Sequence, residues 1–346
     1  MGQPMKDSRA QREAYYRRIG EKHLTPLWEL MSALVPREPQ SPCVPMLWKY
    51  DEVRPWLLES GSLISAQEAV RRVLILENPG LPGQSSITHT LYAGWQLILP
   101  GEVAPSHRHT QTALRLIVEG EGAYTAVDGE RVTMHRGDFI ITPSWTWHDH
   151  GNPAKEPVVW LDGLDIPLVR FLDAGFSEDY PREEQEVIRP EGDARLRYGN
   201  NLLPIGYRLQ GVSSPVFAYP YRLSRQSLEQ LARADKPHPA HGYKMEFINP
   251  ANGGPAMPTM GAFIQLLPRG FTGQPYRCTD GTVFSVIDGR GSLSVDGRVF
   301  AFGERDAFVV PSWQACTLAA EQESVLFSFS DRPVQKALGL WREQLG

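Results

Sequence analysis

The 346-residue sequence has few cysteines, little excess basic charge and no long apolar segment. Its three cysteines, Cys43, Cys278 and Cys316, are too few for a disulfide framework and are typical of a reducing compartment. The formal net charge of −5 offers no basic field for nucleic acid. No apolar run reaches the roughly 18 residues of a membrane span, and the polar start "MGQPMKDSRAQREAYYRRIG" has no apolar signal core. We therefore expect a cytoplasmic protein that binds neither nucleic acid nor membrane.

Glycine and proline are abundant, and they are spread along the chain. The 31 glycines and 29 prolines favour short strands and many turns over long helices. From about residue 88, short apolar runs are separated by Gly, Pro and Asp, and "DG" at 128–129 predicts a hairpin. Residues 7–35 have helical patterning, and a proline-rich connector follows at 36–46. The sequence therefore predicts a mainly β protein with an N-terminal helical segment.

An internal repeat divides the β-rich part of the chain. The segment "PSHRHTQTALRLIVEGEG" (105–122) aligns without a gap with "QPYRCTDGTVFSVIDGRG" (274–291), and "GDFIITPSWTWH" (137–148) aligns with "RDAFVVPSWQAC" (305–316). Such a repeat predicts two copies of one small β-barrel. The expected divisions are an N-terminal helical segment (1–75), a first barrel (76–180), a connecting segment (181–255) and a second barrel with a C-terminal helix (256–346).

Histidines gather in the first copy of the repeat. Five of the nine lie close together in sequence: His107, His109, His135, His148 and His150. On a strand, His107 and His109 point to the same face. A bare His-x-His is more often an ordinary pair of strand residues than a metal site. Here Gly101 precedes the pair and Pro143 and His148 follow it with turns between, so we predict that His107, His109 and His148 bind a metal and that His135 is exposed.

The two histidine segments resemble the two motifs of the cupin superfamily. The first motif, G-x5-H-x-H-x3-4-E-x6-G, is matched by Gly101, His107, His109 and Gly120. The second, G-x5-P-x-G-x2-H-x3-N, is matched by Gly137, Pro143, His148 and Asn152, with Trp145 where glycine is usual. Ala113 and Leu114 stand where the first motif has its glutamate. The resemblance implies a bicupin, with two double-stranded β-helix (jelly-roll) barrels.

More specifically, the chain resembles the gentisate 1,2-dioxygenase family nearly end to end. The stretches that carry the resemblance are "TPLWELM", "ENPGL", "HRHTQTALRLIVEGEG", "GDFIITPSWTWHDHGN", "WLDGLDIP", "VVPSW" and "FSFSD". It implies one Fe(II) per subunit, a homotetramer, and O2-dependent cleavage of gentisate (2,5-dihydroxybenzoate) to maleylpyruvate between the carboxyl-bearing and hydroxyl-bearing carbons. Relatives that cleave salicylate or 1-hydroxy-2-naphthoate leave the substrate open, and a non-catalytic metal- or ligand-binding bicupin is the remote alternative.

The absent glutamate has a chemical consequence. Three protein ligands leave coordination positions open, as a catalytic metal requires. A 2-hydroxybenzoate that chelates through its carboxylate and deprotonated hydroxyl brings two negative charges, which Fe(II) with three neutral imidazoles balances. A glutamate ligand would leave the complex negative in a poorly solvated barrel, where an uncompensated charge is costly. Three histidines therefore favour an anionic chelating substrate. Zinc also binds three histidines, and iron is implied only by the resemblance.

Two residues near the histidines have alternative interpretations. Arg115 shares the parity of His107 and His109 and is expected to hold the substrate carboxylate with its planar fork. The alternative is a surface salt bridge to Glu119 or Glu121. His150 is expected to hydrogen-bond the substrate or to accept a proton. Its alternative is a loop histidine in solvent.

Further site residues follow from the resemblance. One of Arg71 and Arg72 is expected to reach the substrate, as is Gln96. Tyr92 and Gly94 share the parity of Gln96 and are expected to shape the slot for the aromatic ring, with Gly94 leaving space for it. Asp162 is expected to orient a histidine, as carboxylates commonly do near metals, and Asp165 is the competing choice.

The second copy of the repeat has none of these ligands. Tyr276, Cys278 and Cys316 stand at the positions of the three histidines. We expect a degenerate barrel retained for packing. The alternative is that the two thiols face each other as a soft-metal site or an oxidation-sensitive pair.

Overall fold

The computed structural model describes residues 8–208 and 211–346, and the chain divides into two compact units, Met1–Gln40 and Ser41–Gly346. The first unit contains α1 (Ser8–Gly20) and α2 (Leu27–Leu34), in the region where the sequence predicts helix. Within it, the Tyr16 hydroxyl donates to Glu29 at 2.5 Å and accepts from Trp28 Nε1 at 2.9 Å. The large apolar side chains of α2 are exposed: Leu27, Trp28, Leu30, Met31 and Leu34.

The second unit contains two barrels, each built from a six-stranded and a five-stranded antiparallel sheet. The first barrel has one sheet in the order β12 (Ala218–Tyr219), β8 (Phe139–Thr142), β5 (Ala113–Glu119), β10 (Val158–Leu164), β3 (Tyr92–Ile98) and β2 (Val73–Ile75). Its other sheet has the order β11 (Ser177–Asp179), β4 (Val103–His109), β9 (His148–Gly151), β6 (Tyr124–Val127) and β7 (Glu130–Thr133). The hairpin β6–β7 turns at the predicted "DG".

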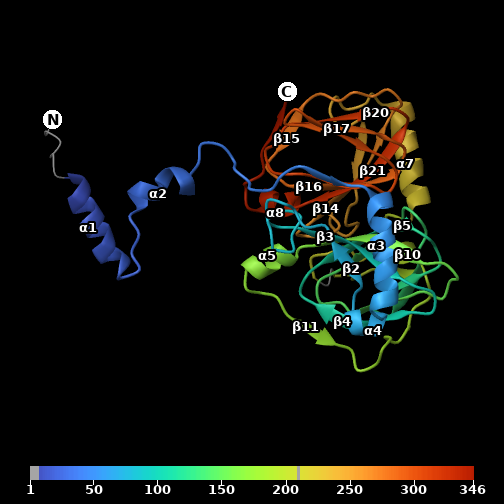
Figure 1. The fold of residues 1–346 in the computed structure, drawn as a ribbon. Coiled ribbons are helices and arrows are strands. Elements are labelled where there is room, and N and C mark those ends of the chain that lie inside the picture. The colour runs from blue at the N-terminus through green and yellow to red at the C-terminus, as the bar shows by residue number, and fades with distance from the viewer. Residues whose placement is uncertain (1–7, 209–210) are drawn as a thin grey trace. The chain divides into compact units, whose positions relative to one another are not determined.

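The second barrel repeats this arrangement. Its six-stranded sheet has the order β1 (Met46–Trp48), β19 (Ala307–Val310), β16 (Thr282–Asp288), β21 (Ser324–Ser330), β14 (Gly261–Leu267) and β13 (Tyr243–Glu246). Its five-stranded sheet has the order β18 (Arg298–Phe302), β17 (Gly291–Val295), β20 (Cys316–Ala320), β15 (Tyr276–Cys278) and β22 (Glu343–Leu345). In Figure 1 the orange and red strands of this barrel lie together, beside the blue-green to green strands of the first. The predicted mainly β bicupin is confirmed.

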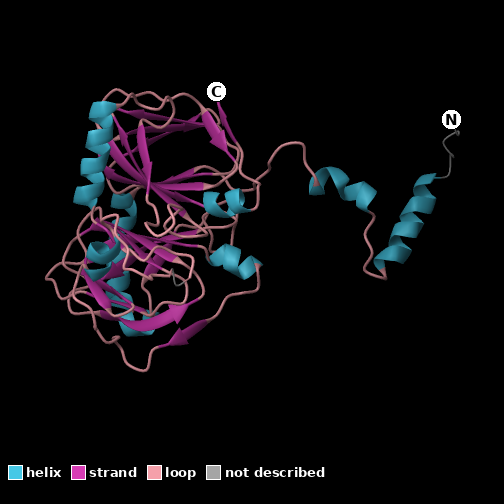
Figure 2. Ribbon diagram, turned by 180° about the vertical axis from the view of Figure 1, so that it is seen from behind, coloured by secondary structure: helices cyan, strands magenta, loops and turns pink. Residues whose placement is uncertain are grey.

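Helices cover parts of both barrels (Figure 2). They are α3 (Tyr50–Leu63), α4 (Ala66–Ala69), α5 (Ile166–Phe171), α6 (Asp193–Tyr198), α7 (Tyr221–Ala234) and α8 (Arg332–Ala337). The helix α3 packs on β3, where the Tyr50 ring meets the fully buried Trp95 edge-on at 5.3 Å. Among the described residues, every helix is too short or too polar to cross a membrane.

Edge strands come from segments that the sequence assigns to helix or connection. β1 pairs with β19 of the second barrel, and β2 pairs with β3 of the first. From the connecting segment, β12 extends the first barrel and β13 the second. The C-terminal helix that "PVQKALGLWREQLG" (333–346) predicts is wrong in extent: α8 is short, Gly339 follows it with a positive φ of 71°, and β22 then pairs with β15. The bounds of the four divisions stay predictions.

Candidate metal centre and active site

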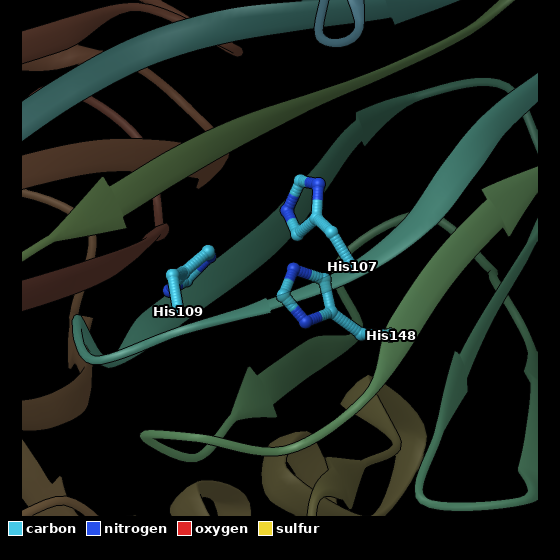
Figure 3. A group of neighbouring side chains, drawn as sticks. All are labelled: His107, His109 and His148. Atoms are coloured by element: carbon cyan, nitrogen blue, oxygen red, sulfur yellow. The ribbon is translucent and has the colours of Figure 1, made fainter. Parts of the chain in front are cut away.

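Two adjacent strands bring three histidines together. His107 and His109 come from β4, and His148 comes from β9, where it lies opposite His107 in the strand pairing. The ring centroids are 4.6 Å (His107–His148), 4.8 Å (His109–His148) and 5.3 Å (His107–His109) apart. Figure 3 shows the three rings gathered around a common point. Their ligand nitrogens lie within 4.8 Å of one another, and no other group of three among the described residues meets this criterion.

Backbone carbonyls orient two of these rings. His109 Nδ1 lies 2.8 Å from the Gln111 carbonyl oxygen, and His148 Nδ1 lies 3.0 Å from that of Thr146. A proton on Nδ1 leaves the Nε2 lone pair free for a metal. His148 Nε2 is buried and has no hydrogen-bond partner. This orphaned nitrogen fits a metal ion, which would satisfy it.

Burial keeps the three imidazoles neutral, as metal ligands must be. It is the largest influence on each ring, and it lowers the pKa of His107 to about 2 and that of His109 to about 4. The pKa of His148 falls well below its usual value for the same reason, and the neighbouring histidines and arginines add to the effect.

A strained turn presents His148. Trp145, where the cupin motif usually has glycine, has a φ of 62°, in a region that side chains rarely adopt. Its amide donates to the His109 carbonyl oxygen at 2.8 Å, and the Arg108 guanidinium lies 4.5 Å from the centre of its ring. Trp313 has the same φ at the equivalent turn of the second barrel. The two turns therefore share a backbone conformation that the repeat preserves without glycine.

Arg115 points into the first barrel. Its side chain is buried, Nη1 donates to Thr142 Oγ1 at 2.5 Å, and Nε lies 3.4 Å from Asp162 Oδ1. The alternative surface bridge is wrong, because Glu119 is bound by Arg54 instead and Glu121 is exposed. The charge of Arg115 adds to the lowering of the pKa of all three histidines, after the larger effect of their burial.

The expected role of Asp162 is corrected. This carboxylate accepts from Trp160 Nε1 at 3.0 Å and lies against Arg115, whereas backbone carbonyls orient the histidines. The competing Asp165 accepts from Thr112 N at 2.9 Å and from Thr259 Oγ1 at 2.6 Å, so it connects the two barrels. Burial raises the pKa of Asp162 to about 6, against the opposing effect of Arg115.

The two adjacent arginines point in different directions. Arg71 Nη2 lies 3.3 Å from His107 Nε2, and the guanidinium also donates to the Pro105 carbonyl oxygen at 3.2 Å. Arg72 is committed to both carboxylate oxygens of Glu102, at 2.8 and 2.5 Å. Arg71 is therefore the one that reaches the histidines, and Arg72 is not part of this cluster. Burial lowers the pKa of Arg71 to about 9, and the charge of Arg115 lowers it further.

His150 is fully buried, so the alternative of a loop histidine in solvent is wrong. Its Nδ1 lies 2.9 Å from Thr125 Oγ1, and its Nε2 is buried without a partner. Its ring centroid lies 5.9 Å from that of His148. His135 is exposed, as the sequence predicts. The first barrel thus holds a second orphaned imidazole nitrogen beside the three histidines.

Three neighbours on β3 are buried: Tyr92, Gly94 and Gln96. Gly94 lies opposite Asp162 in the strand pairing, and Gln96 lies opposite Trp160. A Cβ atom at Gly94 would lie 2.5 Å from Val73 Cγ1 and 2.9 Å from the Leu74 carbonyl oxygen. The glycine therefore lets β2 approach β3, and the expectation that it also leaves space for the substrate ring stays a prediction.

Sequence reasoning missed three partners of the site, Thr125, Thr142 and Trp160. Trp160 precedes Asp162 by two residues on one strand, so the alternation of side chains could have indicated it. Thr125 lies opposite His150 across β6 and β9. That pairing depends on strand register, which a single sequence does not show.

Comparison with known proteins shows the family of the chain. The cupin domain model matches residues 94–164, which include all three histidines. A gentisate 1,2-dioxygenase from Aquipseudomonas alcaligenes is 53% identical over 96% of this chain and 96% of its own length. The chain belongs to the gentisate 1,2-dioxygenase family. The resemblance on which the sequence expectations rest is confirmed.

Other members of this dioxygenase family act on related rings. A 1-hydroxy-2-naphthoate 1,2-dioxygenase from Nocardioides sp. is 36% identical, covering 99% of this chain and 90% of its own. A variant of the salicylate 1,2-dioxygenase from Pseudoaminobacter salicylatoxidans, solved in complex with gentisate, superposes with a TM-score of 0.92 at 36% identity, covering 99% of this chain and 97% of that one. Family membership therefore does not decide which aromatic substrate the protein cleaves.

Acidification is expected to release the metal. Each histidine has a lower pKa in the folded protein than in the unfolded chain, so the stability that it contributes is present above about pH 6.5 and is lost as the pH falls toward the folded values. Protonated imidazole cannot bind a metal. The free energy of unfolding should begin to fall below about pH 6.5, and metal content after dialysis should fall as the pH passes about 4, where His109 protonates, toward 2, where His107 follows. Metal retained in full at pH 2 would contradict these ligands.

Proposed function

We propose that this protein is an Fe(II)-dependent gentisate 1,2-dioxygenase, with one ion per subunit held by His107, His109 and His148. The observation that carries the proposal is the charge of the barrel interior. Three neutral imidazoles face two guanidinium groups, those of Arg71 and Arg115, without a carboxylate among the ligands. An anionic substrate that chelates through carboxylate and hydroxyl supplies the missing negative charge.

The iron, when bound, would hold the two chelating oxygens of the substrate close to dioxygen, so that ring electrons can reach the oxidant. Arg115 would bind the substrate carboxylate, because its buried guanidinium uses Nη1 for Thr142 and Nε for Asp162, which leaves further N–H groups for an anion. Thr142 and Asp162 fix the plane of its guanidinium. Arg71, whose Nη2 lies 3.3 Å from His107 Nε2, adds a second positive group for the same anion.

His150 would exchange a proton with the substrate or dioxygen and stabilise the negative charge that develops on their oxygen atoms. Thr125 fixes its ring through Nδ1, so Nε2 is left to hydrogen-bond an oxygen of the substrate or of dioxygen. Burial holds the pKa of His150 well below its usual value, so the ring is neutral and can either donate or accept at Nε2.

The polar wall of the slot supports gentisate as the substrate. Tyr92 and Asp162 lie on neighbouring strands of one barrel face, and the charge of Asp162 acts on the Tyr92 hydroxyl. We propose that the second hydroxyl of gentisate hydrogen-bonds to this wall, a contact that salicylate would leave unused. Gln96, opposite Trp160, is proposed to contact the ring. Salicylate and 1-hydroxy-2-naphthoate remain the alternative substrates, because relatives of similar fold are named for them.

Oxygen uptake distinguishes these substrates. The protein should be loaded with Fe(II) without oxygen and then assayed with gentisate, salicylate and 1-hydroxy-2-naphthoate. We expect kcat/KM for gentisate to exceed that for salicylate by at least about 100-fold, because a site built for a hydroxyl rejects the analogue that lacks it. A higher value for salicylate would reassign the substrate. Absence of uptake with all three would refute the dioxygenase and leave a non-catalytic bicupin.

Asp162 is expected to affect catalysis without affecting the metal. Asp162→Asn removes the negative charge beside Arg115 but touches no histidine, so iron content should be unchanged while kcat/KM falls roughly 10–100-fold. The matched variant is Asp165→Asn, which should lower the unfolding temperature with little change in kcat/KM, since Asp165 connects the two barrels. Iron loss in Asp162→Asn would contradict this separation.

We also propose a cytoplasmic homotetramer. The exposed apolar side chains of α2 support burial against other subunits, and the three unpaired cysteines support a reducing compartment. Light scattering on the purified protein measures the number of subunits.

A further inference from the structure

The second barrel retains a cavity where the first barrel holds its histidines. Tyr276, Cys278 and Cys316, which align with the three ligands, line a small cavity of about 30 Å³. A larger one of about 500 Å³ adjoins it. Both are lined by the same basic side chains, His241, Lys244 and Arg332. The small cavity has room for about one or two waters or for the head of a ligand.

Lys244 has no counter-ion in this cavity wall. Its side chain is half-buried on β13, and Nζ lies 4.7 Å from the centre of the Phe263 ring. No hydrogen bond or ion pair joins Nζ to any described residue, whereas Arg332 Nε donates to Asp280 at 3.2 Å. Burial lowers the pKa of Lys244 to about 8, and the charge of Arg332 lowers it further. Partial burial of a cation without an anion costs free energy, so a bound anion would stabilise Lys244.

The lining of the small cavity is cationic. It includes Lys244, Arg332 and Arg277, and it includes no Asp or Glu. The nearby Asp280 is already engaged by Arg332 and by Trp341 Nε1 at 2.7 Å. The larger cavity is mixed, with Asp235 and Glu246 beside Lys236 and the Phe263 ring. A ligand with a negatively charged group at one end is thus favoured. That group would lie in the small cavity, and a flat apolar ring would lie in the larger one.

We propose that the second barrel binds a small aromatic carboxylate, with its carboxylate on Lys244 and its ring in the larger cavity. Lys244 supplies a fixed positive charge beside the positions that hold the metal ligands in the first barrel. His241, which stacks on His238 at 4.7 Å and meets Tyr276 edge-on at 4.4 Å, supplies an aromatic wall. This site needs no metal, so it is independent of the proposed function.

Equilibrium dialysis of the iron-loaded protein with labelled benzoate tests the site. We expect Lys244→Met to bind one benzoate fewer per chain than wild type, and Lys236→Met, a change on the rim of the larger cavity, to bind as many as wild type. Arg115→Met should lose only benzoate bound in the first barrel. Equal binding by wild type and Lys244→Met would overturn the proposal. Unchanged benzoate binding by Arg115→Met would count only against the proposed role of Arg115 as the carboxylate-binding residue of the first barrel. Repeating the titration with gentisate under nitrogen shows whether the substrate itself is the ligand.

Thiol protection locates the bound molecule. Cys278 and Cys316 are half-buried in the cavity wall, so a small thiol reagent can be followed at each by peptide mapping, with the buried Cys43 as the internal reference. Benzoate at ten times its Kd should slow modification of both roughly tenfold in wild type. Lys244→Met should show no protection. Full-speed modification of wild type at saturating benzoate would place the ligand elsewhere and overturn the proposal.

Discussion

Replacing His107 with alanine is expected to reduce iron from about one per subunit to near zero and to lower kcat by well over 100-fold. The loss follows from geometry, because His107 lies within ligand distance of His109 and His148 and nothing else among the described residues completes the group. Its ring is only half-buried, so the barrel should still fold. Metal analysis and oxygen uptake on the same preparation measure both effects.

Two controls accompany this variant. His135→Ala removes an exposed histidine of the same barrel and should keep full iron and activity. Cys278→Ser changes the second-barrel position that aligns with His109 and should also keep its iron. Loss of iron from Cys278→Ser would contradict a single metal site in the first barrel.

Replacing Arg115 with methionine is expected to lower kcat/KM for gentisate roughly 100- to 1,000-fold while iron is retained. Truncating one partner of a buried charge pair costs about 2–5 kcal/mol, because the other charge is left unpaired. The substrate carboxylate and Asp162 both lose their cation in this variant. Steady-state kinetics with metal analysis separates this effect from ligand loss.

The matched control is Arg54→Met. Arg54 also binds a residue of β5, Glu119, but this ion pair is partly exposed. It should change stability slightly and leave kcat/KM unaltered. If Arg115→Met were no more impaired than Arg54→Met, Arg115 would not hold the carboxylate.

The sequence was most informative where chemistry recurs at fixed spacing. The repeat located both barrels, since residues 113–119 and 282–288 both form the predicted strands. The spacing of His107, His109 and His148 indicated the three side chains that the fold brings together. Spacing within a strand decides which face a residue occupies, and this information is local.

What the sequence could not show depends on which strands become neighbours. Asp162 lies against Arg115 because β10 pairs with β5 in that register. Gly94 accommodates β2, a strand from the segment expected to be helical. The choice between Arg71 and Arg72 was settled by Glu102, whose carboxylate accepts two hydrogen bonds from Arg72. Each of these contacts joins residues that are distant in the sequence, and no repeating sequence pattern predicts it.

The most direct test of ring cleavage is to supply ¹⁸O2 to the Fe(II)-loaded protein with gentisate and to measure the isotope content of the product by mass spectrometry. One dioxygen should be consumed per gentisate, and maleylpyruvate should carry one labelled atom in the new carboxylate and one in the keto group, which is reduced at once to stop its exchange with water. A product without label in the new carboxylate, or oxygen uptake without ring opening, would contradict a dioxygenase at the three histidines.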